Sequence, residues 1–518
     1  MQGIIQTNLK VPMKFMSLSL FVLIAAAIIY NFTVNTNRKE FTESGKQTIE
    51  KTKDQGRTLS NAPASHQFVQ NINEQYLLQA HDQASFKSML NALQNDQRIN
   101  TLSKNKDRNN ASYPVAIIYS SFADLAAPLE GFVWKLGGVA RQSEFIYKGI
   151  IESFTKIAYN KHLYSKTVAG FMEYLAKPAP DSERFESISD VQNFLANNVV
   201  GVLESSITQF EQLLNDYPQW NSFQFDFDWA LAVNGDFSNN HSNGRYDVFT
   251  RAHLERVVSY MKNTLATIYY FNAFNLDELP TFLNESLWTS VKGTKVQMLN
   301  FRNWFSKDAR NMHLMTPNVY RNILFKKNSN TPRDKYKNFL TLKTDAESAL
   351  TKSHQLLIEA IDHDINYMQQ MYEIAEYPNQ EQYLIDTKYV INDPALEPNR
   401  LEKISQALRG ESEVTDPVSG ESVVINLPVL FTKNFAMDLK QYLPNGFEYT
   451  DQMTNARINV NGQPSFLFSY ARPNAWPDPS LKGVLPGANN NNLYSFHRIL
   501  TNSGDLDVIG NIIFYFLY

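Results

Sequence analysis

Serine, lysine and asparagine residues of this chain come close to one known catalytic pattern. Ser153 and Lys156 form S-x-x-K, which on a helix places an amine one turn away from a hydroxyl. Ser238–Asn240 could supply the second element of a penicillin-binding site, but Lys292–Thr294 has the wrong order for the third element, K-T-G. G-x-S-x-G, H-E-x-x-H and the P-loop are absent. Because Ser153 lies in an apolar helical pattern, we interpret it as structural and predict no catalytic residue.

Two carboxylates offer a different chemistry. Asp226 and Asp228 are two apart in Phe223–Trp229, where apolar and polar residues alternate as in a strand. They would share one face at a separation that suits the acid pair of a glycosidase, about 5–10 Å, although many ordinary strands do the same. The oxygen-rich stretch Asp226–Asn239 could also hold calcium, but its spacing is not that of an EF-hand. Ordinary turn chemistry is the interpretation we favour here.

A third group of candidate residues lies on one predicted helix. Glu359, Asp362 and His363 fall within one turn and could form half of a metal site. The second E-x-x-H pattern that di-iron bundles require is missing, and the nine histidines are scattered. We therefore expect a solvated helix face at these residues, and we predict no metal and no cofactor.

An apolar segment near the start sets the expected location. Phe15–Phe32 contains 18 residues without a charge, which is at the short end of what spans a bilayer. Ala25–Ala27 would suit a signal-peptide cleavage site, whereas Tyr30 is placed as an interfacial aromatic residue that favours an uncleaved anchor. We predict a transmembrane anchor, with residues 1–14 in the cytoplasm and residues 33–65 as a polar tether.

Composition and charge limit what the remaining body does. The chain has 518 residues, of which 43% are hydrophobic, enough for a sizeable core. A net charge of −4 gives no global attraction to nucleic acid, so no nucleic acid is expected as a partner. The absence of cysteine avoids mispairing in an oxidising compartment. A short basic N-terminus before an apolar run is typical of export, so we expect a single-pass protein of the bacterial inner membrane with its body in the periplasm. A body that faces inward is the alternative.

Hydrophobic periodicity predicts a mainly α fold with a smaller mixed region. We expect short helices and a linker over 66–110, a helical body over 111–378, and a C-terminal α+β or β-rich irregular domain over 379–518. The ranges that show helical spacing are 66–96 (two helices), 113–177 (two or more, interrupted at Gly137–Gly138), 187–217, 250–274 and 276–288. Strands are expected at Phe223–Trp229 and Tyr383–Ile391. A hairpin is also expected, and its second strand is Ser422–Phe431.

The clearest helix of the body is long. Thr344 to Glu347 reads as a capping box, and the apolar spacing continues to Tyr377, just before Pro378. These 34 residues would extend about 50 Å, which suits the scaffold of a bundle or an assembly.

Charge is unevenly distributed around this helix. Residues 292–343 carry twelve basic and two acidic residues, a net charge of +10, and aromatic residues are interleaved with them. Residues 345–421 carry sixteen acidic and five basic residues, a net charge of −11. Pairing of the two blocks in a ring or dimer is the interpretation we favour, and it predicts a homo-oligomer. Solvated faces are the main alternative, and binding of single-stranded nucleic acid is a weaker one.

The layout resembles IcmX, the periplasmic component of type IVB (Dot/Icm) secretion systems. The resemblance rests on the segment Phe15–Phe32, the size of the body, the long helix Thr344–Tyr377 and the Pro- and Asn-rich region that follows it. No site residue is carried over. The resemblance implies a non-enzymatic role in secretion, with other envelope or secretion-apparatus proteins as partners. The alternatives are a periplasmic envelope hydrolase and a ligand-binding ectodomain.

Overall fold

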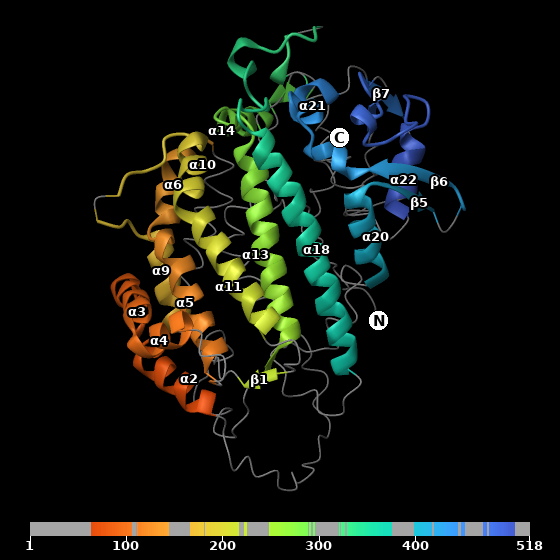
Figure 1. Cartoon of the computed structure of the whole chain (residues 1–518). Coiled ribbons are helices and arrows are strands. Elements are labelled where there is room, and N and C mark those ends of the chain that lie inside the picture. The colour runs from red at the N-terminus through yellow and green to blue at the C-terminus, as the bar shows by residue number, and fades with distance from the viewer. Residues whose placement is uncertain are drawn as a thin grey trace, which may run out of the picture.

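The computed structural model shows a mostly helical protein with a few short two-stranded sheets (Figure 1). This confirms the mainly α prediction. The residues that the structure describes are 64–105, 110, 112–143, 166–180, 182–216, 222–224, 248–287, 290–291, 294–295, 321, 323–326, 329–375, 398–416, 419–443, 447–450, 470–473 and 476–502. The segment Phe15–Phe32 lies outside them.

The first helices form a layer at one side of the molecule (Figure 1). They are α2 (Ala64–Gln75), α3 (Gln83–Asn95), α4 (Gln97–Asn105), α5 (Tyr113–Ala126), α6 (Phe132–Ala140) and α9 (Lys166–Ala176). Two helices over 66–96 were predicted correctly, but within the range 66–110, where a linker was also expected, Gln97–Asn105 forms helix α4. Asp96 caps this helix, because its side-chain carboxylate accepts hydrogen bonds from the backbone N–H of Arg98 at 2.8 Å and from that of Ile99 at 3.1 Å. The buried side chain of Ile99 then anchors α4 in the core.

The break between α5 and α6 is at Gly131 and not at the predicted Gly137–Gly138. Gly131 has φ +66°, a left-handed conformation that favours glycine, and its N–H donates to Tyr174 O at 2.8 Å. Gly138 lies inside α6, where an added Cβ would stand 2.1 Å from Phe185 O. The Gly-Gly pair therefore allows close packing and does not interrupt the helix.

The stretch Tyr113–Ala140 is long and apolar enough to cross a membrane by length and composition alone. It has 28 residues, and 56% of its most apolar 18-residue window is buried inside the protein. All of its residues are buried or half-buried, as in the core helix of a soluble domain. This stretch contains the charged residues Asp124, Glu130 and Lys135, and the single-pass prediction does not count it as a membrane span.

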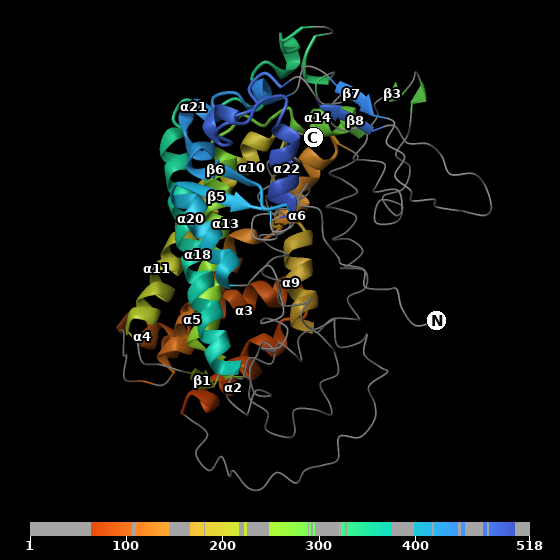
Figure 2. The same cartoon turned by 90° about the vertical axis from the view of Figure 1, so that its right-hand side faces the viewer.

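In the centre, α11 (Val200–Asp216), α13 (Arg251–Asn272) and α18 (Glu347–Ala375) run side by side (Figures 1 and 2). α10 (Ile188–Phe194) and a π-helical turn (Leu195–Val199) lead into α11, and α14 (Leu279–Leu287) follows α13 in the chain. A capping box at Ser187 begins α10. The Ser187 hydroxyl accepts a hydrogen bond from the backbone N–H of Asp190, and the Asp190 carboxylate accepts one from the backbone N–H of Ser187. α13 and α18 approach closely, since the buried Ser353 donates to Ala266 O at 2.7 Å.

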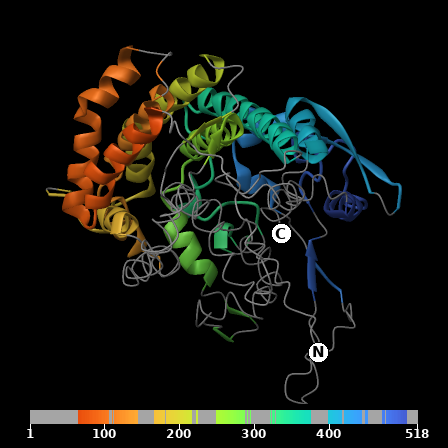
Figure 3. The same ribbon diagram turned by 90° about the horizontal axis from the view of Figure 1, so that it is seen from below.

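The long helix α18 begins three residues later than the capping box predicts. Residues 344–346 form a turn, and the first helical residue is Glu347. The 29 residues of α18 extend about 44 Å at 1.5 Å per residue. Figure 3 shows α18 between the first helices and the C-terminal hairpin.

The C-terminal region combines helices with a hairpin. Its elements are α20 (Pro398–Arg409), β5 (Glu411–Thr415), β6 (Ser422–Asn426), α21 (Lys433–Ala436) and α22 (Leu493–Asn502). β5 and β6 pair antiparallel, with Glu411 opposite Asn426 and Thr415 opposite Ser422. The predicted hairpin is confirmed, but its second strand ends at Asn426, and Leu427–Phe431 is a 3₁₀ helix. α22 was not predicted.

The remaining elements are short. They comprise the strand pairs β1 (Ser222–Gln224) with β2 (Val248–Thr250), β3 (Ser290–Val291) with β4 (Thr294–Lys295), and β7 (Phe447–Thr450) with β8 (Tyr470–Pro473), and the 3₁₀ helices Leu77–Gln79, Ala127–Leu129, Asp334–Tyr336, Leu439–Tyr442 and Leu481–Gly483. β1 covers the start of the predicted strand Phe223–Trp229. The rest of that strand and Tyr383–Ile391 lie outside the described residues.

Two hydrophobic clusters meet at α18. The larger one extends from α2 to the first turns of α18, and it includes Leu350. The second is formed by α20, the β5–β6 hairpin, α22 and the loops between them, and Leu357 and Ile361 of α18 pack against it. The backbone also joins the two parts, because Leu342 N–H donates to Met437 O at 3.0 Å. The core of the C-terminal region therefore extends onto the helical body.

Candidate functional site

A group of charged side chains lies between α11, α13 and α18. Lys262 of α13 is at its centre, with only 5% of its side chain exposed. Its Nζ contacts Glu211 Oε1 of α11 at 2.5 Å and also donates to Glu359 Oε2 of α18. One ammonium group therefore links three helices. We call Glu211, Glu255, Lys262, Glu359 and His363 the helix-joining network.

His363 supplies the second cation of this network. Its Nδ1 lies 2.6 Å from Glu255 Oε2 on α13, and its Nε2 lies 3.7 Å from Glu211 Oε1 on α11. Only 17% of the His363 side chain is exposed. The expected solvated helix face is therefore wrong for His363, because this side of α18 packs against α11 and α13.

The surroundings fix the protonation states in the network. Burial alone would lower the pKa of His363, but the carboxylates of Glu211 and Glu255 outweigh burial and raise its pKa to about 9. At Glu211 the neighbouring His363 outweighs burial and, together with the Lys262 ammonium group, lowers the pKa of this carboxylate to about 2. Burial also opposes the charge of Lys262, yet Glu211 and Glu359 raise its pKa.

These pKa values oppose a role in proton transfer. A general acid or base works best when its pKa lies near the operating pH. Around neutral pH, His363 keeps its proton and Glu211 stays ionised. The network is therefore suited to holding helices together as a set of paired charges.

Two further ion pairs extend this pattern along α18. Arg256 of α13 is half-buried, pairs with Asp364 and stacks over the Tyr260 ring at 4.1 Å. Asp362 lies on another side of α18 and accepts from Arg409 of α20 at 2.6 Å, where both side chains are about half exposed. Each pair therefore fixes α18 to a different neighbour.

The three residues of the hypothetical half metal site thus point to different partners. Glu359 binds Lys262, Asp362 binds Arg409, and His363 binds Glu255. Among the described residues, no group of three or more His, Cys, Asp or Glu side chains could hold a metal ion.

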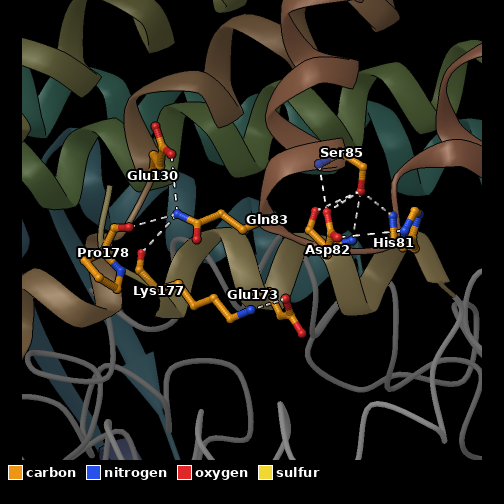
Figure 4. A network of polar contacts seen from close by, with 8 residues as sticks. All are labelled: His81, Asp82, Gln83, Ser85, Glu130, Glu173, Lys177 and Pro178. Atoms are coloured by element: carbon orange, nitrogen blue, oxygen red, sulfur yellow. Dashed lines mark hydrogen bonds and ion pairs between the residues drawn. The ribbon is translucent and has the colours of Figure 1, made fainter. Parts of the chain in front are cut away.

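A second polar cluster contains a serine, a histidine and an aspartate (Figure 4). Ser85 Oγ donates to Asp82 Oδ1 at 2.6 Å and accepts from the backbone N–H of His81 and of Asp82, each at 3.0 Å. The His81 ring instead contacts Gln79 O through Nδ1 at 2.8 Å. A catalytic serine needs its hydroxyl bonded to the histidine. Here Asp82 and Ser85 form the capping box of α3.

The same view shows how α3 is fixed to α9 (Figure 4). Gln83 Nε2 donates to Pro178 O at 3.1 Å and reaches Glu130 Oε1 at 3.4 Å. Lys87 Nζ of α3 donates to the other oxygen of Glu130 at 2.7 Å. These contacts join the start of α3 to the loop before α6 and to the end of α9.

Most of the candidate residues chosen from sequence lie outside the described residues. These are Ser153, Lys156, Asp226, Asp228, Asn234, Asp236, Ser238, Asn239, Asn240, Lys292 and Gly293. The sequence did not indicate the helix-joining network, because its members come from three separate helices. The sequence of α13 nevertheless contains one indication of buried charge. Glu255 lies three residues before Val258 and Lys262 lies four residues after it, so both charged residues fall on the apolar side of the helix.

The described ion pairs of the acidic block use cations from outside the basic block. Glu359 and Asp364 of α18 pair with bases of α13, which lies outside residues 292–343. In the basic block, Lys335 pairs with Glu285 of α14, and Lys326 lies 3.4 Å from Asp334. Among the described residues, the ion pairs therefore do not join one block to the other.

Comparison with protein-family models, with curated proteins and with solved structures finds no match for this chain.

Proposed function

We propose that this chain is an extracytoplasmic structural subunit of a bacterial envelope machine, a secretion system. In this proposal Phe15–Phe32 anchors it in the inner membrane, and the body assembles in the periplasm with copies of itself and with other envelope proteins. The observation that carries the proposal is the helix-joining network, in which ionisable side chains are fixed in ion pairs between helices. Such pairs position helices, and they keep the charged groups of the network away from the protonation equilibrium that a general acid or base needs near neutral pH.

The absence of cysteine allows a direct test of location. A single cysteine at the exposed Gln406 on α20 would be the only thiol in the chain. We expect Gln406→Cys to react with a membrane-impermeant maleimide in cells whose outer membrane alone is permeable. The matched control Gln2→Cys should react only after the inner membrane is broken. The opposite pattern would place the body in the cytoplasm and contradict the proposal.

The assembly role has its own test. The full-length chain in detergent is expected to form an oligomer by light scattering after size exclusion, and to cross-link to envelope proteins in cells. A monomer that cross-links to no envelope protein would contradict an assembly role. Hydrolysis of peptidoglycan in a zymogram, abolished by Asp226→Asn, would favour the hydrolase alternative. A thermal shift with one metabolite would favour the ligand-binding ectodomain.

A further inference from the structure

The β5–β6 hairpin has one buried face and one exposed face. Val414, Val423 and Ile425 are buried in the second hydrophobic cluster with residues of α20 and α22. Glu411 and Glu413 of β5 are exposed on the other face. The hairpin lies at the outside of the molecule (Figure 1). Packing on one side thus holds the sheet in place while the glutamates face solvent.

The two outer edges of this sheet differ. At the β6 edge, Asn426 N–H donates to Val484 O at 2.8 Å, so a neighbouring loop covers that edge. At the hairpin end, Asp416 N–H donates to Glu421 O at 2.8 Å, which directs the backbone groups of Asp416 inward. Since these groups alternate along an antiparallel strand, those of Glu411, Glu413 and Thr415 point away from β6.

The outward groups of β5 form an edge that no described residue pairs through its backbone. Within the part of the chain that the structure describes, no backbone hydrogen bond reaches the N–H or C=O of Glu411, Glu413 or Thr415. An unpaired row of this kind is a template for one more strand. The paired strands need no rearrangement to accept that strand, because their register is set and their buried face is already packed.

The charge of the edge selects among possible strands. The carboxylates of Glu411 and Glu413 are two residues apart, and neither forms an ion pair with another described residue. If a second copy paired through its own β5, glutamates would face glutamates, and like charges opposite each other destabilise a sheet. A strand with Lys or Arg at alternate positions would place a cation opposite each glutamate.

We propose that the outer edge of β5 binds an extended segment of a partner protein with Lys or Arg at alternate positions. Backbone hydrogen bonds to the three outward residues provide affinity, and the two glutamates provide specificity, as in other cases of strand addition. The inference goes beyond the proposed function, because it depends on this edge alone and not on where the chain is located.

The test uses the full-length chain in a neutral detergent and a fluorescent peptide of sequence Lys-Thr-Lys-Thr-Lys-Thr. The control peptide Lys-Lys-Lys-Thr-Thr-Thr has the same charge but lacks the alternation. We expect the alternating peptide to bind more tightly by fluorescence anisotropy. It should also slow hydrogen exchange at the amides of Glu411, Glu413 and Thr415, which face the added strand.

Two variants separate strand addition from simple charge attraction. Glu413→Pro removes an outward N–H that the hairpin does not use, and proline is tolerated at such an edge. The double variant Glu411→Lys, Glu413→Lys keeps every backbone group and reverses the charge. Each should weaken binding about tenfold or more. The control Glu402→Lys, an exposed residue of α20, should bind as the original chain does. If Glu413→Pro unfolds the chain, the double variant still tests the charge, and hydrogen exchange still tests the edge.

Three results would overturn the inference. The first is no binding of the alternating peptide. The second is equal binding of both peptides, or full binding to a folded Glu413→Pro variant, which would indicate unspecific charge attraction. The third is a dimer that Glu413→Pro dissociates, which would assign the edge to a second copy. Each result is measured on purified protein, so none of them depends on the location of the body.

Discussion

Two polar regions of the molecule are built from similar residues but differ in their exposure to water. The helix-joining network buries Lys262 between two glutamates, with 5% of its side chain exposed. The capping box at the start of α3 uses Asp82, whose side chain is 47% exposed, and the nearby Lys177 is 55% exposed. A charge left without its partner costs far more in the first environment than in the second. Residue type alone therefore does not indicate which ion pairs hold the fold together.

The largest effect is expected at the centre of the network. Lys262→Met removes the cation that, among the described residues, links Glu211 and Glu359. Glu211 keeps its contact with His363, whereas Glu359 loses its ion pair while it is partly buried. We expect the free energy of unfolding to fall by about 3–5 kcal/mol, measured by urea denaturation. A fall below about 1 kcal/mol would show that water screens this network as it does a surface pair.

A smaller effect should appear as a pH dependence. The pKa of His363 is about 9 in the folded chain and 6.5 in the unfolded chain, so its stabilisation is complete below pH 6.5 and is lost as the pH rises through 9. We expect a loss of about 2–3 kcal/mol over this range. The chain has no cysteine to titrate there.

The matched variants for this pH dependence are two histidines in different environments. His363→Gln should remove most of the decline in unfolding free energy between pH 6.5 and 9. His81→Gln should keep it, because 59% of the His81 side chain is exposed. A decline of full size in His363→Gln would assign the titration to another group.

The capping box should contribute less than either buried charge. Asp82→Ala removes the acceptor of the Ser85 N–H and also the partner of the Ser85 hydroxyl. We expect a loss of about 1 kcal/mol, seen as a lower urea midpoint and faster hydrogen exchange in the first turn of α3. Asp82→Asn retains an acceptor oxygen and should restore most of it. An effect as large as that of Lys262→Met would remove the contrast between the two regions.

The smallest effect is expected at a pair whose cation is exposed. Lys177, which follows the last residue of α9 and is 55% exposed, lies 2.6 Å from the largely buried Glu173 of α9. Lys177→Met should change the free energy of unfolding by less than about 0.5 kcal/mol, because water and salt screen this charge. It makes the same substitution as Lys262→Met, so the ratio of the two effects measures the influence of burial directly.

Sequence periodicity predicted the helices that pack by an apolar stripe. α3, α11 and α13 were found in this way because Leu93, Leu213 and Val258 each belong to a regular series of buried residues. α4 was missed because its polar composition resembles a linker, and only the capping by Asp96 and the burial of Ile99 make it a helix. Local pattern is informative where the buried face lies within one segment.

The candidate site was harder to predict for a related reason. His363 was selected from sequence, but its partners Glu211 and Glu255 precede it by more than one hundred residues. Only the packing of α11 and α13 against α18 brings these side chains together. Gly138 gives a second example, since its close contact with Phe185 O depends on a segment far along the chain. Contacts between distant segments are invisible to periodicity.

The position of α18 between the two hydrophobic clusters has a mechanical consequence. Leu350 belongs to one cluster, and Leu357 and Ile361 of the same rigid rod pack on the other. A force on the C-terminal hairpin would therefore be transmitted through α20 and α18 to α13 in the helical body.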